Sequence, residues 1–425
     1  MRILVVGGGG REHALCWRLS QNATVDRLYA APGNAGMAEL ATLVALSSGD
    51  VDGLVEFAER ESIDLTVVGP EAPLVAGLAD EMQSRGMRVF GPTLEAARLE
   101  GSKAWARRLC ERHGIPTPRS GEFTEVEPAM AFLDQLDPPY VIKADGLAAG
   151  KGVAIAAAHP QAREALENCL VRRAFGPAGQ RVLIEEFLDG VEVSAMALID
   201  GQQVVPLALA HDYKRAHDGD AGPNTGGMGS YSPVPSVDAD AEKVVIEEVL
   251  TATARALDDE GVRYQGVLYA GLMMTPEGPK VLEFNCRFGD PETQVVLPRL
   301  RSDLGEALLA CVEGNLGVYR LSWDAQVCVA VVLASAGYPG PAETGLPISG
   351  LEEAGTIPGV RVFHSGTALR AGRVVTSGGR VLTVSALGAD YRTARRLAYE
   401  ACSLIRFDGM AYRRDVGADA EEAVG

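Results

Sequence analysis

The chain has 425 residues, of which 47% are hydrophobic and 23% are charged. This is the composition of a globular protein with two to four domains, at about 150 residues per domain, and it excludes a disordered or fibrous chain. The 57 Asp and Glu residues outnumber the 39 Lys and Arg residues, so the formal net charge is −18. This charge argues against nonspecific binding to nucleic acid or to an anionic membrane.

The sequence predicts neither a membrane span nor a secretory signal. Its longest apolar run, residues 327–336, has about half of the roughly 20 residues that a bilayer requires. The apolar stretch at residues 3–6 is far shorter than the roughly 7–15-residue core of a signal peptide. The seven cysteines are odd in number and never spaced C-x-x-C, as is typical of reduced thiols, so we expect a cytoplasmic protein.

The first hundred residues alternate short apolar runs with helical periodicity. The runs 2–6, 25–30 and 63–68 predict buried strands, and the apolar positions within 51–58 follow helical spacing. Strands separated by single helices predict a parallel sheet.

Each of these three strands ends in a loop rich in Gly and Pro, at residues 7–10, 31–36 and 69–73. Parallel strands place such loops at one edge of the sheet, where open α/β folds bind ligands. The first loop also suggests a dinucleotide site, but Glu12 stands where the G-x-G-x-x-G pattern needs its third glycine. The pattern therefore favours a small-molecule site with a phosphate seat over an NAD site.

A second Gly-rich segment follows the predicted strand 140–144 and precedes another at 153–158. It is not a P-loop, because only three residues separate Gly146 from Gly150 and Gly152 follows Lys151. We predict a hairpin with a lysine at its tip. Such a lysine could meet phosphate charge, but the segment taken alone favours a solvated surface hairpin.

Oxygen ligands and polar loops occur later in the chain. Glu283 and Asn285 stand two apart in a predicted strand, so both side chains point to one side and suit Mg²⁺ held mostly by nucleotide phosphates. The loops 212–215 and 224–229 are too long for simple turns, and long loops are often functional. Their cations could bind an anionic substrate; an ordered surface loop is the alternative. Gly378-Gly379 predicts a β-hairpin.

Together these segments resemble the ATP-grasp superfamily and, within it, the glycinamide ribonucleotide synthetase family. The resemblance covers essentially the whole chain and is carried by residues 9–14, 31–36, 68–74, 143–152, 222–229 and 283–294. It implies a multidomain α/β and α+β protein with an ATP-grasp fold. The expected parts are an N-terminal Rossmann-like domain (1–102), an ATP-grasp domain (103–322) with a lid at about 121–189, and a small β-rich C-terminal domain (323–425).

The resemblance also implies a reaction. Members of the family ligate glycine to 5-phosphoribosylamine through glycyl phosphate in purine biosynthesis, and they form glycinamide ribonucleotide, ADP and phosphate. We accordingly expect ATP with Mg²⁺ or Mn²⁺, small-molecule substrates only, and a monomer. Phosphoryl transfer needs mainly positioning and charge neutralisation, which suits a chain without an evident Ser, Cys or His nucleophile.

Roles carried over by resemblance fall into four groups. The catalytic residues are Arg287, Asp290 and Lys151, and the metal ligands are Glu283 and Asn285. The nucleotide contacts are Lys103, Lys143, Gly150, Gly152, the hinge residues Glu185, Glu186, Phe187 and Leu188, and the ribose-binding acid Glu192. The substrate contacts are Gly9, Gly10, Asn34, Glu71, Asp212, Lys214, Thr225, Gly226, Gly227, Met228 and Gly229.

Two positions depart from wider patterns. Tyr213 stands where the family often has His, which argues against acid–base chemistry there. Residues 269–272 lack the extra metal-binding acid of many ATP-grasp enzymes, which favours this family over carboxylases and dipeptide ligases. The remaining alternatives are a formate-using transformylase, a carboxylating aminoimidazole ribonucleotide synthetase, a dinucleotide-dependent oxidoreductase and a non-catalytic nucleotide sensor.

Overall fold

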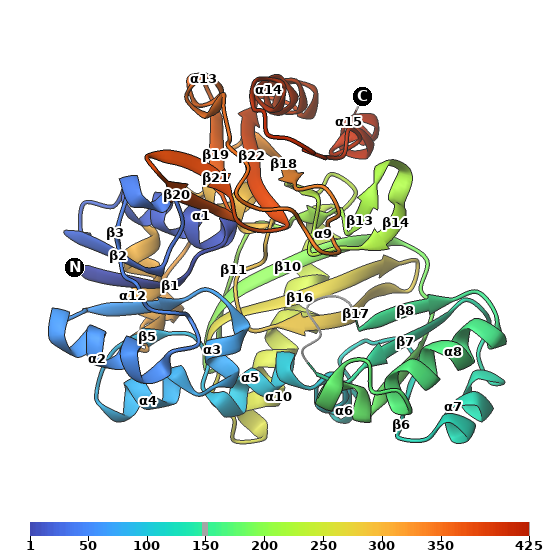
Figure 1. The fold of residues 1–425 in the computed structure, drawn as a ribbon. Helices are drawn as coiled ribbons and strands as arrows, with labels where there is room; N and C mark the ends of the chain where they lie inside the picture. The colour runs from blue at the N-terminus through green and yellow to red at the C-terminus, as the bar shows by residue number, and fades with distance from the viewer. Residues whose placement is uncertain (147–151, 425) are drawn as a thin grey trace.

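A computed structural model describes residues 1–146 and 152–424. Figure 1 shows the N-terminal sheet at the left, the C-terminal strands at the top and a smaller sheet at the lower right. A long antiparallel sheet lies between them. The expected mixed α/β architecture is therefore confirmed.

The N-terminal sheet is entirely parallel, as predicted, with the strand order β3-β2-β1-β4-β5. Helices flank it, so β4 is buried along its whole length, as parallel strands covered on both faces are. Its strands are β1 (Arg2–Gly7), β2 (Arg27–Pro32), β3 (Thr42–Leu43), β4 (Leu65–Val68) and β5 (Val89–Phe90). Its helices are α1 (Gly10–Leu19), α2 (Val51–Glu61), α3 (Glu71–Val75), α4 (Leu78–Ser84) and α5 (Leu94–Gly101).

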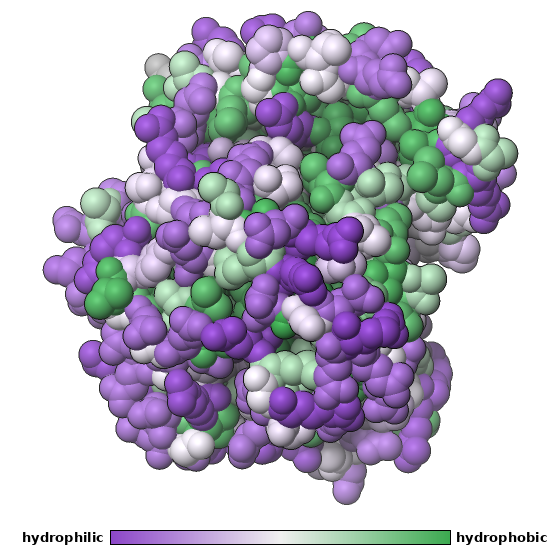
Figure 2. Space-filling model, turned by 90° about the vertical axis from the view of Figure 1, so that its left-hand side faces the viewer, coloured by the Kyte–Doolittle hydropathy of each residue, from purple (hydrophilic) through white to green (hydrophobic). Residues whose placement is uncertain are grey.

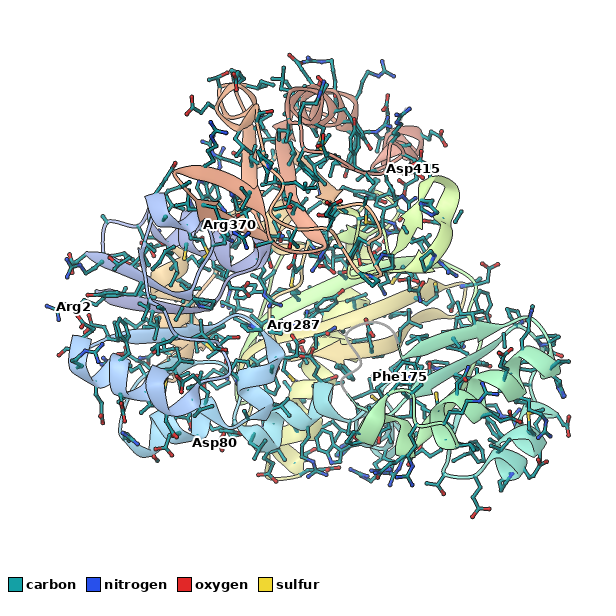
Figure 3. All side chains as sticks on the ribbon, viewed as in Figure 1. Arg2, Asp80, Phe175, Arg287, Arg370 and Asp415 are labelled. Atoms are coloured by element: carbon teal, nitrogen blue, oxygen red, sulfur yellow. The ribbon has the colours of Figure 1, made fainter. Side chains whose placement is uncertain are left out.

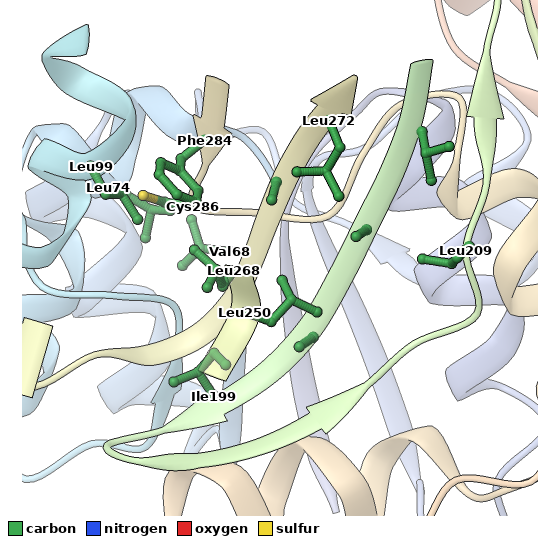
Figure 4. Close-up of a cluster of buried hydrophobic side chains, with 14 of the residues drawn as sticks. Val68, Leu74, Leu99, Ile199, Leu209, Leu250, Leu268, Leu272, Phe284 and Cys286 are labelled. Atoms are coloured by element: carbon green, nitrogen blue, oxygen red, sulfur yellow. The ribbon is translucent and has the colours of Figure 1, made fainter. Parts of the chain in front are cut away.

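The central sheet is antiparallel in the order β11-β10-β16-β17. Apolar side chains from its strands and from the neighbouring helices form a continuous core, which Figure 4 shows around Leu268, Leu272 and Phe284. Its strands are β10 (Val191–Asp200), β11 (Gln203–Pro206), β16 (Gln265–Thr275) and β17 (Gly278–Asn285). A long helical stretch consists of α9 (Ala239–Val244), a π-helical segment (Val245–Thr251) and α10 (Ala252–Asp259). Helix α6 (Lys103–His113) precedes the smaller sheet.

The smaller sheet, here named the outer sheet, has the order β6-β9-β7-β8 and its own apolar core. Antiparallel pairing of β7 with β8 confirms the predicted hairpin. The tip of that hairpin, with Gly150 and Lys151, lies outside the described residues. The elements are β6 (Ser120–Phe123), α7 (Val126–Leu133), β7 (Tyr140–Ala144), β8 (Val153–Ala156), α8 (His159–Leu170) and β9 (Val182–Glu186).

The C-terminal sheet has the order β12-β15-β18-β22-β19. Two of its strands, β12 (His211–Asp212) and β15 (Gly229–Ser232), come from the middle of the chain, where local sequence gives no sign of this distant pairing. The others are β18 (Val327–Ala334), β19 (Val360–His364) and β22 (Arg380–Gly388), packed against α14 (Tyr391–Leu404). Smaller elements are β13 (Arg215–His217), β14 (Ala221–Asn224), α11 (Thr293–Val296), α12 (Leu304–Val312), α13 (Leu351–Gly355) and α15 (Ala418–Val424).

The hairpin predicted at Gly378-Gly379 is wrong. These glycines join β21 (Arg373–Thr376) to β22, and the two strands belong to different sheets. The tight hairpin lies instead at Ala371-Gly372, between β20 (Thr367–Arg370) and β21. Both of its central residues have positive φ, 48° and 75°, as the turn of a two-residue hairpin requires.

Figure 2 views the molecule from the side of the N-terminal sheet, and hydrophilic side chains predominate on the lower part of that face. None of the helices in the described ranges combines the length and the apolar character that crossing a membrane would need.

Candidate active site

The three Gly/Pro loops meet at one edge of the N-terminal sheet, as expected. The N–H of Gly33 donates to the carbonyl of Gly7 at 3.1 Å, and a Cβ on Gly8 would lie 2.5 Å from the carbonyl oxygen of Gly33. The Glu12 carboxylate accepts from the N–H of Gly9 at 2.6 Å and pairs with Arg11 at 2.6 Å. Glu12 therefore occupies an amide that a dinucleotide phosphate would use, which argues against an NAD site.

Asn34 holds this loop cluster together. Its Nδ2 donates to the carbonyls of Gly8 (2.9 Å) and His364 (2.7 Å), and its Oδ1 accepts from the N–H groups of Gly36 (3.0 Å) and Met37 (3.1 Å). These four bonds use the ordinary capacity of an amide side chain. The side chain thus has a structural function, whatever contact the loop makes with a substrate.

Glu283 and Asn285 lie at the end of β17 and face the same side. Their neighbours Phe284 and Cys286 are 5% and 2% exposed and point into the core, as Figure 4 shows. The two oxygen donors are only partly buried on the opposite face. The alternation inferred from the sequence is therefore present in the structure.

Lysines surround Glu283. Lys214 Nζ lies 3.9 Å from Glu283 Oε1 and 2.7 Å from Glu192 Oε2. Burial alone would raise the pKa of Glu283, but Lys214, Lys143 and Lys103 outweigh it and hold this pKa below its ordinary value. The carboxylate stays ionised beside cations that can meet phosphate charge.

The other two lysines come from α6 and the outer sheet. Lys103 Nζ donates to the carbonyl of Gly146 at 2.8 Å, and burial lowers its pKa although Glu283 opposes the shift. Lys143 Nζ donates to the carbonyl of Leu282 at 2.8 Å and lies 2.6 Å from Glu185 Oε2. These contacts place both lysines at the junction of the outer and central sheets.

Glu185 is buried. Acids that alternate along a strand usually mark a solvent-exposed edge of a sheet, but this one does not. It is 1% exposed on β9, an inner strand, and pairs with both Lys143 and Arg107. Glu186 is partly exposed and accepts from the N–H of Arg119 at 2.9 Å. Phe187 is 43% exposed and Leu188 is buried. These residues form the connection from the outer sheet to β10.

Arg287 lies at the centre of the molecule (Figure 3). Its Nε is 3.3 Å from Glu71 Oε2, and its Nη2 donates to Asn285 Oδ1 at 2.9 Å and lies 3.2 Å from Glu100 Oε1. Burial disfavours its charge, but Glu100 and Glu71 outweigh burial and raise the pKa of Arg287. This one guanidinium connects two acids of the N-terminal helices to the end of β17.

Asp290 contacts the C-terminal sheet through Arg380, which the sequence analysis did not single out. Arg380 Nη2 lies 3.1 Å from Asp290 Oδ2, and Nη1 donates to the carbonyls of Asp290 (2.7 Å) and Gly226. Gln294 Nε2 donates to Asp290 Oδ1 at 2.7 Å. Burial opposes ionisation of Asp290, but Arg380 and Arg11 hold its pKa below the ordinary value.

The two polar loops pair with each other. Thr225 donates its N–H to the carbonyl of Lys214 at 2.7 Å, and Met228 donates to Tyr213 at 2.8 Å. Gly227 has φ 107°, and a Cβ there would lie 2.6 Å from Asp212 Oδ1. The loop from Thr225 to Gly229 therefore lies directly against residues 212–214.

Asp212 lies near a second set of buried polar groups, which the sequence analysis did not identify. Burial and the neighbouring Glu292 raise the pKa of Asp212, whose Oδ1 is buried without a hydrogen-bond partner among the described residues. Glu292 is 2% exposed and accepts from the hydroxyls of Ser194 (2.9 Å) and Tyr269. Tyr269, on β16, thus donates a hydrogen bond to a buried acid.

Tyr213 is bound to the C-terminal segment. Its hydroxyl donates to Asp419 and accepts from the N–H of Gly417 at 2.8 Å. Burial is the largest cause that raises the pKa of this hydroxyl. The tyrosine therefore stays neutral and holds the C-terminal segment against the loop at residues 212–215.

The protein offers few metal donors. Within residues 1–146 and 152–424, no three His, Cys, Asp or Glu side chains are grouped so that they could hold a metal ion. All seven cysteines are buried and form no disulfide. The cationic cluster of Lys103, Lys143, Lys214 and Arg287 around two oxygen donors therefore suits a polyphosphate that itself completes the coordination of a hard cation.

Comparison with protein-family models gives three matches along the chain. Residues 1–100 match the phosphoribosylglycinamide synthetase N domain, residues 101–293 its ATP-grasp (A) domain and residues 328–419 its C domain.

Curated relatives and solved structures agree with these matches. The chain is 50% identical to a phosphoribosylamine–glycine ligase of Halalkalibacterium halodurans, over 100% of this chain and 99% of the relative. A Pseudomonas aeruginosa protein of the same name is also 50% identical, over 98% and 97% of the two chains. The crystal structure of phosphoribosylamine–glycine ligase from Thermotoga maritima has a TM-score of 0.84 at 37% identity and covers 98% of this chain and 100% of that one.

Proposed function

Because the chain belongs to the phosphoribosylglycinamide synthetase family, we propose that it ligates glycine to 5-phosphoribosylamine at the expense of ATP. The products are glycinamide ribonucleotide, ADP and phosphate, formed through glycyl phosphate. The observation that carries this proposal is the position of Arg287, which contacts Glu71 of the N-terminal helices and the oxygen donor Asn285. Such a contact connects a site for the amine substrate with a site for ATP.

The nucleotide site we propose lies between the outer and central sheets. Lys103 and Lys143 supply charge for the phosphates, residues 185–188 supply backbone groups for the adenine, and Glu192 binds the ribose. Gly152 belongs to the hairpin that would close over the phosphates, and residues 121–189 would act as the lid. Gly150 and Lys151 lie outside the described residues, so their assignment to the same hairpin rests on the resemblance alone.

The metal we propose is Mg²⁺ or Mn²⁺, held by Glu283 and Asn285. The donor set fits, because Glu283 is kept ionised by the surrounding lysines and an amide oxygen is also a hard ligand. When bound, the ion would neutralise phosphate charge. Only two protein donors are needed, because nucleotide phosphates and water supply the rest.

The amine substrate would bind at the Gly/Pro loops and the loops paired with them. We assign to it Gly9, Gly10, Asn34, Glu71, Asp212, Lys214, Thr225, Gly226, Gly227, Met228 and Gly229. Arg287 would hold the acyl phosphate oxygens and Asp290 would orient the amine, which must approach the activated carbonyl carbon closely for transfer. The contacts of Arg287 with Glu71 and of Asp290 with Arg380 support this assignment of roles, since they fix the orientation of both side chains.

Domains 1–102, 103–322 and 323–425, a monomeric state and a cytoplasmic location complete the proposal. The unpaired, buried state of all seven cysteines supports a reducing compartment. Analytical ultracentrifugation would measure the oligomeric state.

The test of the proposed function is ADP release from ATP with 5-phosphoribosylamine and one second substrate at a time. We expect release with glycine and none with formate or bicarbonate. Release with formate or bicarbonate but not glycine would assign the chain to another ATP-grasp reaction. ATP binding without turnover in any mixture would make it a nucleotide sensor, and NAD binding without ATP binding would restore the oxidoreductase alternative.

A further inference from the structure

A buried acid outside the assigned residues contacts the middle of the site. Glu100 is 8% exposed and lies near the end of α5, three residues before Lys103. Its Oε2 accepts a hydrogen bond of 2.7 Å from the N–H of Cys286, and its Oε1 lies 3.2 Å from Arg287 Nη2. One carboxylate therefore contacts both the backbone and the side chain of the segment that follows Asn285.

Among the described residues, Glu100 supplies the charged partner of Arg287 Nη2. Nη2 of Arg287 lies between Glu100 and Asn285, whereas Nε faces Glu71. A guanidinium is planar, so carboxylates at Nε and at Nη2 set the orientation of the whole group. Without Glu100, Nη2 would retain only the neutral Asn285 amide as a side-chain partner among the described residues.

Burying the Glu100 carboxylate costs free energy, so its presence at this position needs an explanation. A carboxylate removed from water is costly unless it is paired, and burial raises the pKa of Glu100 although Arg287 opposes the shift. A packed apolar residue at this position would avoid that cost. The presence of an acid here is therefore explained by its contacts with Arg287 and with the backbone of Cys286.

We propose that Glu100 is a positioning residue that orients Arg287 and, through the Cys286 backbone, the oxygen donor Asn285. The inference rests on the proposed function for its kinetic consequence. Through these two contacts Glu100 fixes the end of β17 against the N-terminal helices, so that the proposed amine site and the proposed ATP site keep a constant relative geometry.

The informative variant is Glu100→Gln. The Gln Oε1 can still accept from the N–H of Cys286, but its neutral NH₂ group cannot accept from Arg287, so the substitution separates the two contacts. Glu100→Asp keeps the charge on a shorter side chain and serves as the conservative variant. Glu95→Gln is the matched control, because Glu95 is exposed on the same helix.

Two measurements test the proposal: steady-state kinetics with glycine and 5-phosphoribosylamine, and the Mg²⁺ dependence of ATP binding by calorimetry. We expect Glu100→Gln to lower kcat roughly 10- to 100-fold, as misplacement of reacting groups does, with smaller changes in the KM values. We also expect a several-fold higher Mg²⁺ midpoint, partial recovery in Glu100→Asp, and wild-type values for Glu95→Gln.

The proposal would be overturned if Glu100→Gln kept both the wild-type kcat and the wild-type Mg²⁺ midpoint. A lower melting temperature with an unchanged kcat per folded molecule would reduce Glu100 to a stabilising residue and would also overturn it. If the wild-type protein released no ADP with glycine, the proposed function would fail, and the Mg²⁺ midpoint of ATP binding would then decide the role of Glu100 by itself.

Discussion

The N–H of His364 donates a hydrogen bond of 2.8 Å to Nδ1 of His13. His13 lies on α1 and His364 ends β19, so this bond joins the N-terminal Gly-rich loop to the C-terminal sheet. Both rings are nearly inaccessible to water, at 7% and 8% exposure. Burial lowers the pKa of His13 to about 3 and that of His364 to about 4, so both side chains are neutral at physiological pH.

This pair predicts a loss of stability in mild acid. The pKa of each histidine is lower in the folded chain than the value of about 6.5 expected when it is unfolded. The unfolded state therefore binds more protons below about pH 6.5, and stability falls as the pH decreases from there toward 4. For His13 the loss is of the order of 2 kcal/mol at pH 5.

Chemical denaturation between pH 5 and 7 would measure this loss. The variant His13→Asn keeps an acceptor near Nδ1 but cannot be protonated, so its stability should vary less with pH than that of the wild type. His217→Asn removes an exposed histidine and should leave the pH dependence unchanged. Equal slopes for the wild type and His13→Asn would contradict the assigned burial effect.

Glu283→Gln should reduce turnover by about two orders of magnitude and raise the Mg²⁺ concentration needed for activity. The substitution replaces an ionised oxygen ligand with a neutral one of the same shape. It also leaves Lys214 with one fewer carboxylate partner. Glu277→Gln is the control, because Glu277 lies on the exposed turn that joins β16 to β17. Wild-type rates throughout a Mg²⁺ titration of Glu283→Gln would refute the metal-binding role.

Features set by local pattern could be predicted from the sequence. Strand β7 has the predicted bounds, because a buried run between turn signals defines it. The common direction of Glu283 and Asn285 follows from the two-residue period of a strand. The three Gly/Pro loops meet because parallel strands end at one edge, which requires no knowledge of distant contacts.

Features set by distant partners could not be predicted. β12 has two residues and acquires its identity only by pairing with β15. Glu100 and Arg380 lie in no motif, and their importance lies in partners far along the chain. The prediction of a hairpin at Gly378-Gly379 was wrong for the same reason. Two glycines permit a turn, but they do not determine which strands pair with β22.

Arg380→Ala should weaken binding of 5-phosphoribosylamine, with a rise in its KM of roughly 10-fold or more. The guanidinium contacts both Asp290 and the Gly226 carbonyl, so its loss would no longer fix their relative position. Arg380→Lys should recover little, because an ammonium group cannot reproduce the planar fork of donors. Arg373→Ala, on the preceding strand β21, removes an exposed arginine and should leave the KM for 5-phosphoribosylamine unchanged. A KM for 5-phosphoribosylamine equal to that of the wild type would show that Arg380 only supports the fold.

Glu185→Gln should destabilise the protein by about 3–5 kcal/mol, because two buried cations would lose their counter-ion. Glu185 pairs with Lys143 at 2.6 Å and with Arg107, and the three side chains are 1%, 6% and 5% exposed. Glu127→Gln is the contrasting control. Its pair with Arg163 spans 2.7 Å, but the Glu127 side chain is 77% exposed, and such exposed pairs contribute little to stability. Urea unfolding at neutral pH would measure both. If the two variants lost similar stability, the buried pairs of Glu185 with Lys143 and Arg107 would contribute no more to folding than an exposed ion pair.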